Sequence, residues 1–239
     1  MKQVFGKTMI FIAGAMIICS GCDTTRNMNK AQKGAVIGST GGAVIGGVIG
    51  NNVGNKNNTA LGAIIGAVVG GVAGGLIGNK MDKQAEAIKS EIPGAEVTRV
   101  GEGINVTFSE NNPDGSKAGV YFATAMYDIN SNSKLALTKL IKVFNSYPET
   151  NILIEGHTDD VGTPAYNETL SKNRANEVGS YLKSAGIESS RLTIKWYGEM
   201  QPKVDNTSDA NRAQNRRVEF AITANDKMKE AAAKEAANN

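Results

Sequence analysis

The chain has 239 residues, enough for one well-packed domain and further segments. Its 26 Lys and Arg residues nearly balance 23 Asp and Glu residues, so no basic stripe argues for nucleic acid as a partner. His157 is the only histidine, and Cys19 and Cys22 are the only cysteines. This excludes a multi-histidine metal site, and we expect neither zinc nor another cofactor.

The N-terminus has the pattern of a secretory signal peptide over residues 1–21. A basic start precedes an apolar run over residues 8–18 that is too short to span a bilayer well. Small residues then precede Cys22, which resembles the lipobox of bacterial lipoproteins, although the usual Leu three places earlier is Cys19 here. The resemblance implies cleavage before Cys22 and its lipidation by acyl chains such as palmitate, which would anchor the protein to a membrane. The alternative is an ordinary signal peptide cut near Gly21.

A glycine repeat follows the short polar tether of residues 22–33. Glycine recurs at every fourth position over residues 34–54 and again over residues 62–78. This spacing places the glycines on one stripe of a helix, where a second helix can approach closely. The pattern predicts a glycine-zipper helical hairpin over residues 34–80, and it resembles the glycine-zipper segments of other bacterial envelope lipoproteins.

Three roles fit this zipper. It inserts in a bilayer, because both uncharged segments are about as long as a hydrocarbon core is thick. It associates with copies of itself from other molecules into a homo-oligomer, or it is a flexible glycine-rich spacer. Glycine costs a water-exposed helix about 1 kcal/mol per residue against alanine, so the regular ladder favours the first two roles.

The zipper is followed by a charged helical stretch and a β-hairpin. Residues 81–94 predict a helix that ends at Pro93-Gly94. Its apolar positions are few, and we therefore expect a solvated connector. Residues 96–100 and 104–109 alternate in polarity around a glycine turn, which is typical of a hairpin.

The rest of the chain alternates between strand and helix patterns. A helix with Leu137, Leu140, Ile141 and Phe144 on one face is expected to be capped by residues 131–133. The order β-α-β-α-β predicts an α/β (α+β) two-layer sandwich with a mixed sheet over residues 95–224. A charged tail, expected to be a frayed exposed helix, occupies residues 225–239. The remaining expected elements are a strand at 120–123, a strand around Ile152 and Ile154, a helix at 167–185 stopped by Gly186, and strands at 192–197 and 216–223.

One carboxylate and one guanidinium stand out in this pattern. Asp159 follows an apolar strand, and Arg174 lies on the next helix, on the face that it shares with Asn167 and Ser171. A fixed anion beside a fixed planar cation suits a ligand that carries an ammonium and a carboxylate together. The alternative is a salt bridge between the two that holds the loop to the helix.

These residues belong to the pattern GHTD–x2–G–x4–N–x2–LS–x2–RA, followed by NRRVE. The pattern resembles the OmpA-like peptidoglycan-binding domain, and the resemblance covers about residues 97–223. In that family an Asp and an Arg clamp the free end of diaminopimelate in the peptide stem. The resemblance implies that Asp159 holds the ammonium and Arg174 the carboxylate, with further contacts near Thr158, Asn167 and Leu170.

Two details qualify the resemblance. After the expected strand at 120–122 many members have acidic or amide residues, but this chain has Ala123-Thr124-Ala125, so we carry over no ligand contacts from that loop. Arg216 and Arg217 flank the last strand, where alternation sends them to opposite faces and at most one can point at the ligand. We include Arg217 as a candidate.

The motif does not suggest catalysis. His157 has no partnered Ser or Cys nucleophile, and we expect it to orient the loop at the end of the strand. The sequence therefore predicts a non-enzymatic lipoprotein that binds peptidoglycan non-covalently and tethers the outer membrane to the cell wall, facing the periplasm. Asp23 resembles an inner-membrane retention signal of some bacteria, but the OmpA-like domain favours the outer membrane.

Two alternatives remain. In the first, a membrane-inserting or self-associating zipper is the working part, and the wall-binding domain only positions it. The second is a wall-processing enzyme, for which the sequence offers no nucleophile or metal site.

Overall fold

The computed structural model describes residues 69–109, 120, 122 and 125–238. The expected signal peptide, Cys22 and residues 34–68 of the expected glycine zipper lie outside the described residues. None of the helices in the described part is both long and apolar enough to cross a membrane.

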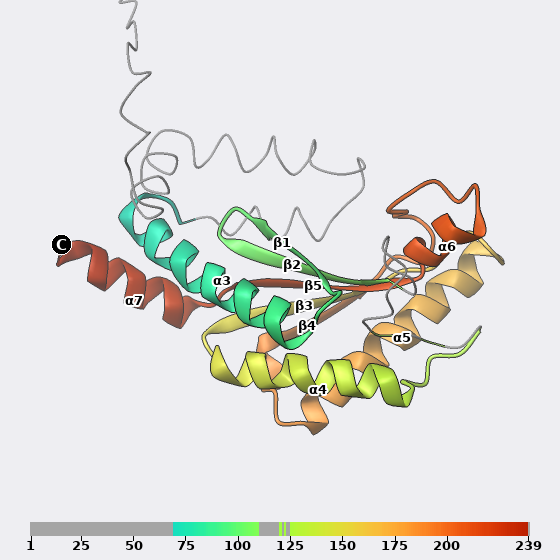
Figure 1. The fold of residues 1–239 in the computed structure, drawn as a ribbon, viewed down its shortest axis with the longest axis horizontal. Coiled ribbons are helices and arrows are strands. Elements are labelled where there is room, and N and C mark those ends of the chain that lie inside the picture. Colours follow the sequence, from blue (N-terminus) through green and yellow to red (C-terminus); the bar gives the residue numbers. More distant parts are fainter. Residues whose placement is uncertain (1–68, 110–119, 121, 123–124, 239) are drawn as a thin grey trace, which may run out of the picture.

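Five strands form one mixed sheet in the order β1-β2-β5-β3-β4 (Figure 1). β3 and β4 run parallel, and the other neighbours are antiparallel. Apart from the strand at 120–123, the expected strands and the hairpin are present within one or two residues of their predicted ends. Their bounds are Glu96–Val100 for β1, Gly103–Ser109 for β2, Thr150–Gly156 for β3, Leu192–Trp196 for β4 and Arg217–Ala224 for β5.

The sheet buries one apolar face because its strands alternate in polarity. On β2, Ile104, Val106 and Phe108 are completely buried, and on β5 so is Phe220. The rings of Phe108 and Phe220 meet edge to face at 5.6 Å between centroids. The predicted two-layer α/β architecture is confirmed, because helices cover this apolar face.

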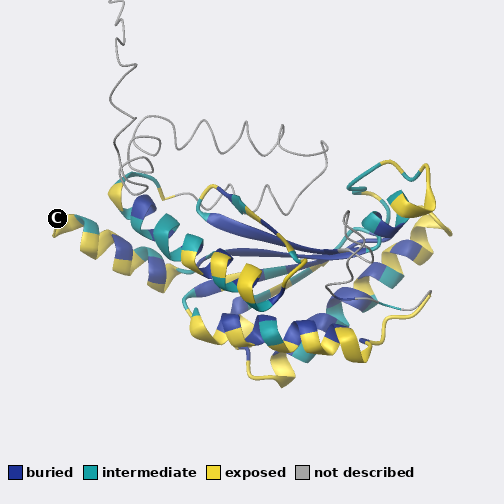
Figure 2. Ribbon diagram, in the orientation of Figure 1, coloured by how far each residue is buried: buried dark blue, intermediate teal, exposed yellow. Residues whose placement is uncertain are grey.

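Two of these helices were expected from the sequence. α4 (Ser131–Ser146) and α5 (Pro164–Ser184) turn their buried sides towards the sheet (Figure 2). The cap of α4 is Asn130, whose side chain accepts from the backbone N–H of Ser133 at 2.9 Å. α5 begins three residues earlier than expected, because Thr163 caps it and Pro164 occupies its first turn.

The helix before the sheet is not the solvated connector that the sequence predicted. α3 (Gly71–Glu91) starts within the second glycine ladder and continues across residue 81 without a break. Its side chains Ile77, Met81 and Ile88 are completely buried in the hydrophobic core. At its start the carboxylate of Glu102 accepts from the backbone N–H of Val69 and of Gly70, at 2.8 and 3.0 Å.

The charged tail is a docked helix. α7 (Asp226–Ala237) is capped by Asn225, whose side chain accepts from the backbone N–H of Met228 at 3.0 Å. Met228 and Ala232 are buried against the core, and α7 lies beside α3 (Figure 1). The expectation of a frayed exposed helix was therefore wrong on its inner side, although its charged residues do face solvent.

The expected strand at 120–123 is not borne out where the structure describes it. Val120 is buried and Phe122 half-buried, but both lie outside the strands. A short helix that the sequence did not predict, α6 (Asp209–Asn215), precedes β5, and a 3-10 turn, η1 (Ser189–Arg191), precedes β4.

Candidate functional site

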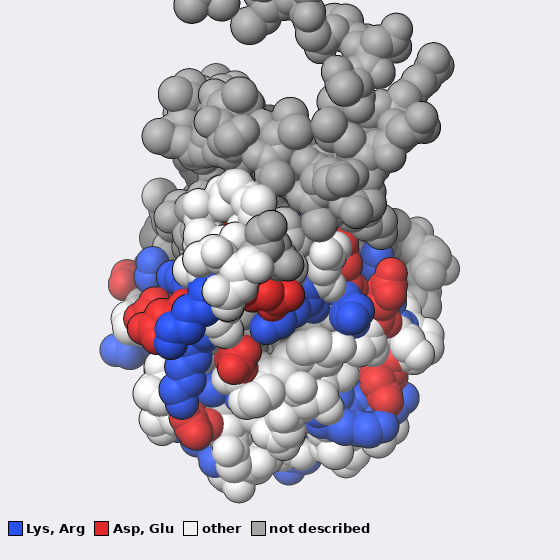
Figure 3. All heavy atoms as spheres, turned by 90° about the vertical axis from the view of Figure 1, so that its left-hand side faces the viewer, with Lys and Arg blue, Asp and Glu red and all other residues white. Residues whose placement is uncertain are grey.

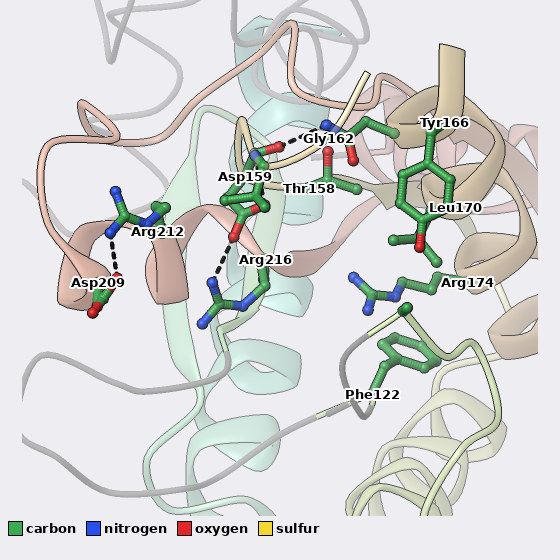
Figure 4. Close-up of a pocket in the computed structure, with 13 residues that line it drawn as sticks. Phe122, Thr158, Asp159, Gly162, Tyr166, Leu170, Arg174, Asp209, Arg212 and Arg216 are labelled. Atoms are coloured by element: carbon green, nitrogen blue, oxygen red, sulfur yellow. Dashed lines mark hydrogen bonds and ion pairs between the residues drawn. The ribbon is translucent and has the colours of Figure 1, made fainter. Parts of the chain in front are cut away.

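A pocket of about 470 Å³ opens where β3 ends and α5 begins (Figure 4). Three parts of the chain converge on it: the loop after β3 with the first turns of α5, the segment before α4, and α6. The residues that line it are Phe122, Ala125, Thr158, Asp159, Val161, Gly162, Tyr166, Asn167, Leu170, Arg174, Asp209, Arg212 and Arg216.

Asp159 is held firmly in the loop between β3 and α5. Its carboxylate accepts from the guanidinium of Arg216 at 2.6 Å and from the backbone N–H of Val161 at 3.2 Å. Its side chain is only 10% exposed. Gly162 has a φ of 114°, a conformation that favours glycine and lets the loop turn back towards α5. The carboxylate is therefore fixed in position while one side of it faces the pocket.

Arg174 reaches the pocket from α5. Its Nε donates to the backbone carbonyl of Met126 at 3.0 Å, and its guanidinium lies 5.0 Å from the centroid of the Phe122 ring. The segment before α4 therefore orients the guanidinium plane. Figure 4 shows Arg174 extending from the α5 side towards Asp159 and Arg216. The ion pair of Asp159 with Arg216 differs from the salt bridge to Arg174 that the sequence left open.

The other expected contacts also line the pocket. Asn167 is buried, and its amide donates to the backbone carbonyl of Asp159 and to Glu199. Leu170 supplies an apolar wall one turn before Arg174. Thr158 is 2% exposed, and its hydroxyl has no hydrogen-bond partner within the part of the chain that the structure describes. A buried hydroxyl beside a pocket is available to a ligand.

Arg217 does not line the pocket. Its side chain is buried, pairs with Glu219 and donates to the backbone carbonyl of Gln201 at 3.0 Å. Arg216 faces the pocket in its place. Of the two neighbouring arginines only Arg216 lines the pocket, because β5 begins at Arg217 and Arg216 is the residue that follows α6.

Sequence reasoning missed the contribution of α6. Arg212 and Asp209 also line the pocket, and they form an ion pair with each other. One signal was present in the sequence: Arg212 and Arg216 are four residues apart, which places them on one side of a helix.

A buried polar cluster lies beneath the pocket loop. His157 is completely buried, and its ring stacks on that of Tyr197 at 5.4 Å between centroids. Burial, with a smaller effect of Arg217, lowers the pKa of His157 to about 3, so the ring is neutral at physiological pH. This neutral, buried ring agrees with the expected structural role.

Glu155 belongs to the same cluster. Its carboxyl group accepts from the Tyr197 hydroxyl at 3.1 Å. Burial, reinforced by Glu219, raises the pKa of Glu155 to about 7. Among the described residues no group of three or more His, Cys, Asp or Glu side chains could hold a metal ion.

Comparisons with known proteins match two families in one chain. A sequence model of the OmpA family matches residues 121–216, and a model of the YMGG-like Gly-zipper matches residues 1–82. Among solved structures, a MotB-like protein from Desulfovibrio vulgaris superimposes with a TM-score of 0.50 at 32% identity, over 62% of this chain and 89% of that one.

Several curated relatives carry the same domain in different settings. The protein named "Probable lipoprotein YiaD" from Escherichia coli K12 is 31% identical over 89% of this chain and 94% of its own length. The peptidoglycan-associated lipoprotein of Haemophilus influenzae is 36% identical over 43% of this chain and 67% of its own. Outer membrane porin F of Pseudomonas fluorescens is 42% identical over 40% of this chain, which spans only 29% of that porin.

The relative that matches along nearly its whole length and the ordered motifs around the pocket lead to one assignment. The chain belongs to the OmpA family of envelope proteins, and its OmpA domain follows a YMGG-like glycine zipper.

Proposed function

We propose that the protein binds peptidoglycan non-covalently through the diaminopimelate of the peptide stem, and that it tethers the outer membrane to the cell wall. The observation that carries the proposal is a buried carboxylate and an oriented guanidinium, Asp159 and Arg174, which reach one pocket from different elements. The name of the peptidoglycan-associated lipoprotein from Haemophilus influenzae supports wall binding, and that of the probable lipoprotein from Escherichia coli supports a lipid anchor.

The chemistry of the pocket fits the free end of diaminopimelate. That end carries an ammonium and a carboxylate on one carbon atom. Asp159 accepts from the ammonium, and Arg174 donates to the carboxylate through its planar fork. Both residues are at least nine-tenths buried, so solvent and salt screen these contacts less than on an open surface. The hydroxyl of Thr158 supplies a further contact.

Arg216 holds the carboxylate of Asp159 in place before the ligand arrives. A carboxylate has two oxygens that accept several hydrogen bonds, so the ion pair with Arg216 leaves capacity for the ammonium. A stem with lysine in place of diaminopimelate lacks the second carboxylate and leaves Arg174 without its ligand contact. We therefore expect such a stem to bind poorly.

Weak binding at one site is sufficient for a tether. Acyl chains on Cys22 would hold the protein in the outer membrane, facing the periplasm beside a polymeric wall that presents many stems. The high effective concentration then makes the attachment stable. The pocket supplies charges and hydrogen bonds, and the proposed function requires no bond to be broken, so we propose a binding protein and not an enzyme.

Sedimentation with purified sacculi tests the clamp, using the full-length protein in mild detergent. We expect Asp159→Asn and Arg174→Gln each to weaken binding on the order of tenfold or more, because each leaves a ligand charge without its partner. The matched controls are Asp160→Asn and Lys183→Gln, which remove the same charges at exposed positions outside the pocket. Circular dichroism confirms that each variant is folded.

Competition by small ligands identifies the group that is recognised. Free meso-diaminopimelate is expected to displace the protein from sacculi, whereas cadaverine, which lacks the carboxylates, and pimelate, which lacks the ammoniums, are not. If both pocket variants sediment as the wild type does, the clamp is wrong. The glycine zipper would then become the working part of the molecule.

A further inference from the structure

The described lining of the pocket offers more guanidiniums than the end of diaminopimelate has carboxylates. Among the described residues, three guanidiniums and two carboxylates line it: Arg174, Arg212 and Arg216 with Asp159 and Asp209. The end of diaminopimelate brings one ammonium and one carboxylate. In the proposed binding mode this carboxylate contacts Arg174, so neither Arg212 nor Arg216 has a ligand contact.

Arg212 and Arg216 lie on the side of α6. Figure 4 shows Arg212 at the edge away from Arg174, with Arg216 and Asp159 between them. Arg212 donates to the backbone carbonyl of Asn206 at 2.9 Å and pairs with the carboxylate of Asp209. Arg216 follows one turn later and pairs with Asp159.

The two ion pairs differ in their exposure to water. The side chain of Asp159 is 10% exposed, whereas that of Asp209 is 96% exposed. An exposed ion pair is weak, because water competes for both partners. Arg212 can therefore exchange Asp209 for another carboxylate at little cost in free energy. A ligand bound by Asp159 and Arg174 would bring such a carboxylate close to Arg212.

We propose that Arg212, assisted by Arg216, forms a second anion subsite that takes another carboxylate of the same peptide stem. The inference rests on the proposed function, in which Asp159 and Arg174 hold the diaminopimelate end. The preferred ligand is thus a stem with two free carboxylates, one beside the ammonium and one farther along. In the peptidoglycan stem this second group is either the α-carboxylate of D-glutamate or the carboxylate at the C-terminal end.

The subsite makes the protein sensitive to how the stem has been processed. Amidation of D-glutamate removes the first source of the second carboxylate. Cross-linking through the C-terminal end of the stem removes the other. We therefore expect stems without the relevant modification to be the preferred attachment points.

Calorimetric titration of the full-length protein in detergent tests the subsite. The probes are the synthetic tripeptide L-Ala-γ-D-Glu-meso-diaminopimelate, its D-glutamate α-amide and its C-terminal amide. In the wild type, one of the two amides is expected to bind about five- to tenfold more weakly than the unmodified tripeptide. The amide that shows the loss identifies the carboxylate.

Three variants connect this loss to α6. In Arg212→Gln the same amide is expected to bind about as well as the unmodified tripeptide, whereas Arg212→Lys, which keeps the charge, retains the difference. Asp209→Asn removes the competing carboxylate and is expected to strengthen binding of the unmodified tripeptide. The matched control is Asp226→Asn, which removes an equally exposed carboxylate from an i,i+3 ion pair on α7.

The outcomes separate the subsite from the clamp. If the wild type fails to bind the unmodified tripeptide, the proposed function itself fails. Equal binding of all three tripeptides, or an amide effect that persists in Arg212→Gln, removes only the second subsite. A weaker tripeptide affinity in Asp209→Asn also contradicts it.

Discussion

Glu155 lies opposite Glu219 in the pairing of β3 with β5, and its side chain is completely buried. Burial alone would raise the pKa of Glu219. Its net pKa is nevertheless below the ordinary value, mainly because the guanidinium of Arg217 stabilises the charged carboxylate. Glu155 has the weaker compensation of one Tyr197 hydroxyl. Two buried carboxyl groups whose pKa values are shifted in opposite directions therefore lie side by side in the sheet, and the stability of this cluster depends on pH.

The change Glu155→Gln should remove this dependence. The pKa of Glu155 is about 7 in the folded protein against an ordinary 4.5, so the folded state keeps a proton that the unfolded state loses. Glu155 therefore lowers the free energy of unfolding. This loss of stability is absent below pH 4.5, grows as the pH rises, and reaches its full size above pH 7. We expect Glu155→Gln to be more stable than the wild type by up to about 3 kcal/mol at pH 8, with little difference at pH 4.

Urea unfolding at both pH values, followed by Trp196 fluorescence, measures this difference. His157 has the opposite effect, because its lowered pKa costs stability as the pH falls through 6.5 towards 3. Since both proteins contain His157, its contribution cancels when they are compared. An equal gain from the exposed-residue control Glu230→Gln, or a gain that does not change with pH, would contradict the assignment.

The spacing of the motif predicted that Asp159 and Arg174 reach one site, but it did not predict which arginine near β5 lines the pocket. Asp159 and Arg174 follow from a strand end and a helix face, both visible as hydrophobic periodicity. The choice between Arg216 and Arg217 depends on where α6 ends and β5 begins. That boundary is set by tertiary packing and was one residue away from the prediction.

At the scale of elements, the predicted boundary at residue 80 hid the amphipathic pattern of α3. The buried positions Ile77, Met81, Ala85, Ile88 and Ile92 recur every three or four residues. The predicted glycine zipper ended at residue 80, so this row of apolar residues was split between two predicted segments. The part after residue 80, which also contains charged residues, was therefore expected to be solvated. The helix docks because this stripe is continuous over its whole length.

The change Ile88→Ala tests the docking of α3. Removing a completely buried side chain from the core is expected to cost about 2–5 kcal/mol. The neighbouring change Lys89→Ala, at an exposed position, should stay within about 0.5 kcal/mol of the wild type. Urea midpoints measured by Trp196 fluorescence give both values. A solvated connector would show equally small effects for the two.

At the scale of the whole molecule, the pocket and the start of α3 lie at opposite ends (Figure 1). The end where α3 begins and α7 finishes carries positive and negative side chains side by side, with no broad patch of one sign on the face shown (Figure 3). On this face, a mixed surface of this kind does not provide the broad basic patch that attracts a nucleic acid or an anionic membrane.

Anchoring through Cys22 predicts a separation of membrane and wall binding. We expect Cys22→Ser to lose incorporation of labelled palmitate and to leave the outer-membrane fraction, while the purified protein still sediments with sacculi. The control Cys19→Leu introduces the usual lipobox residue and should remain anchored. If Cys22→Ser stays in the membrane fraction, the glycine zipper itself provides the attachment.

The continuity of α3 with the sheet has a mechanical consequence. In a protein anchored before Val69 and bound to the wall at the pocket, tension would run from one end of the domain to the other. The strands run between these two ends (Figure 1). A pulling force along the strands therefore shears the hydrogen bonds between neighbouring strands simultaneously and does not break them one at a time. The domain would then act as a stiff spacer.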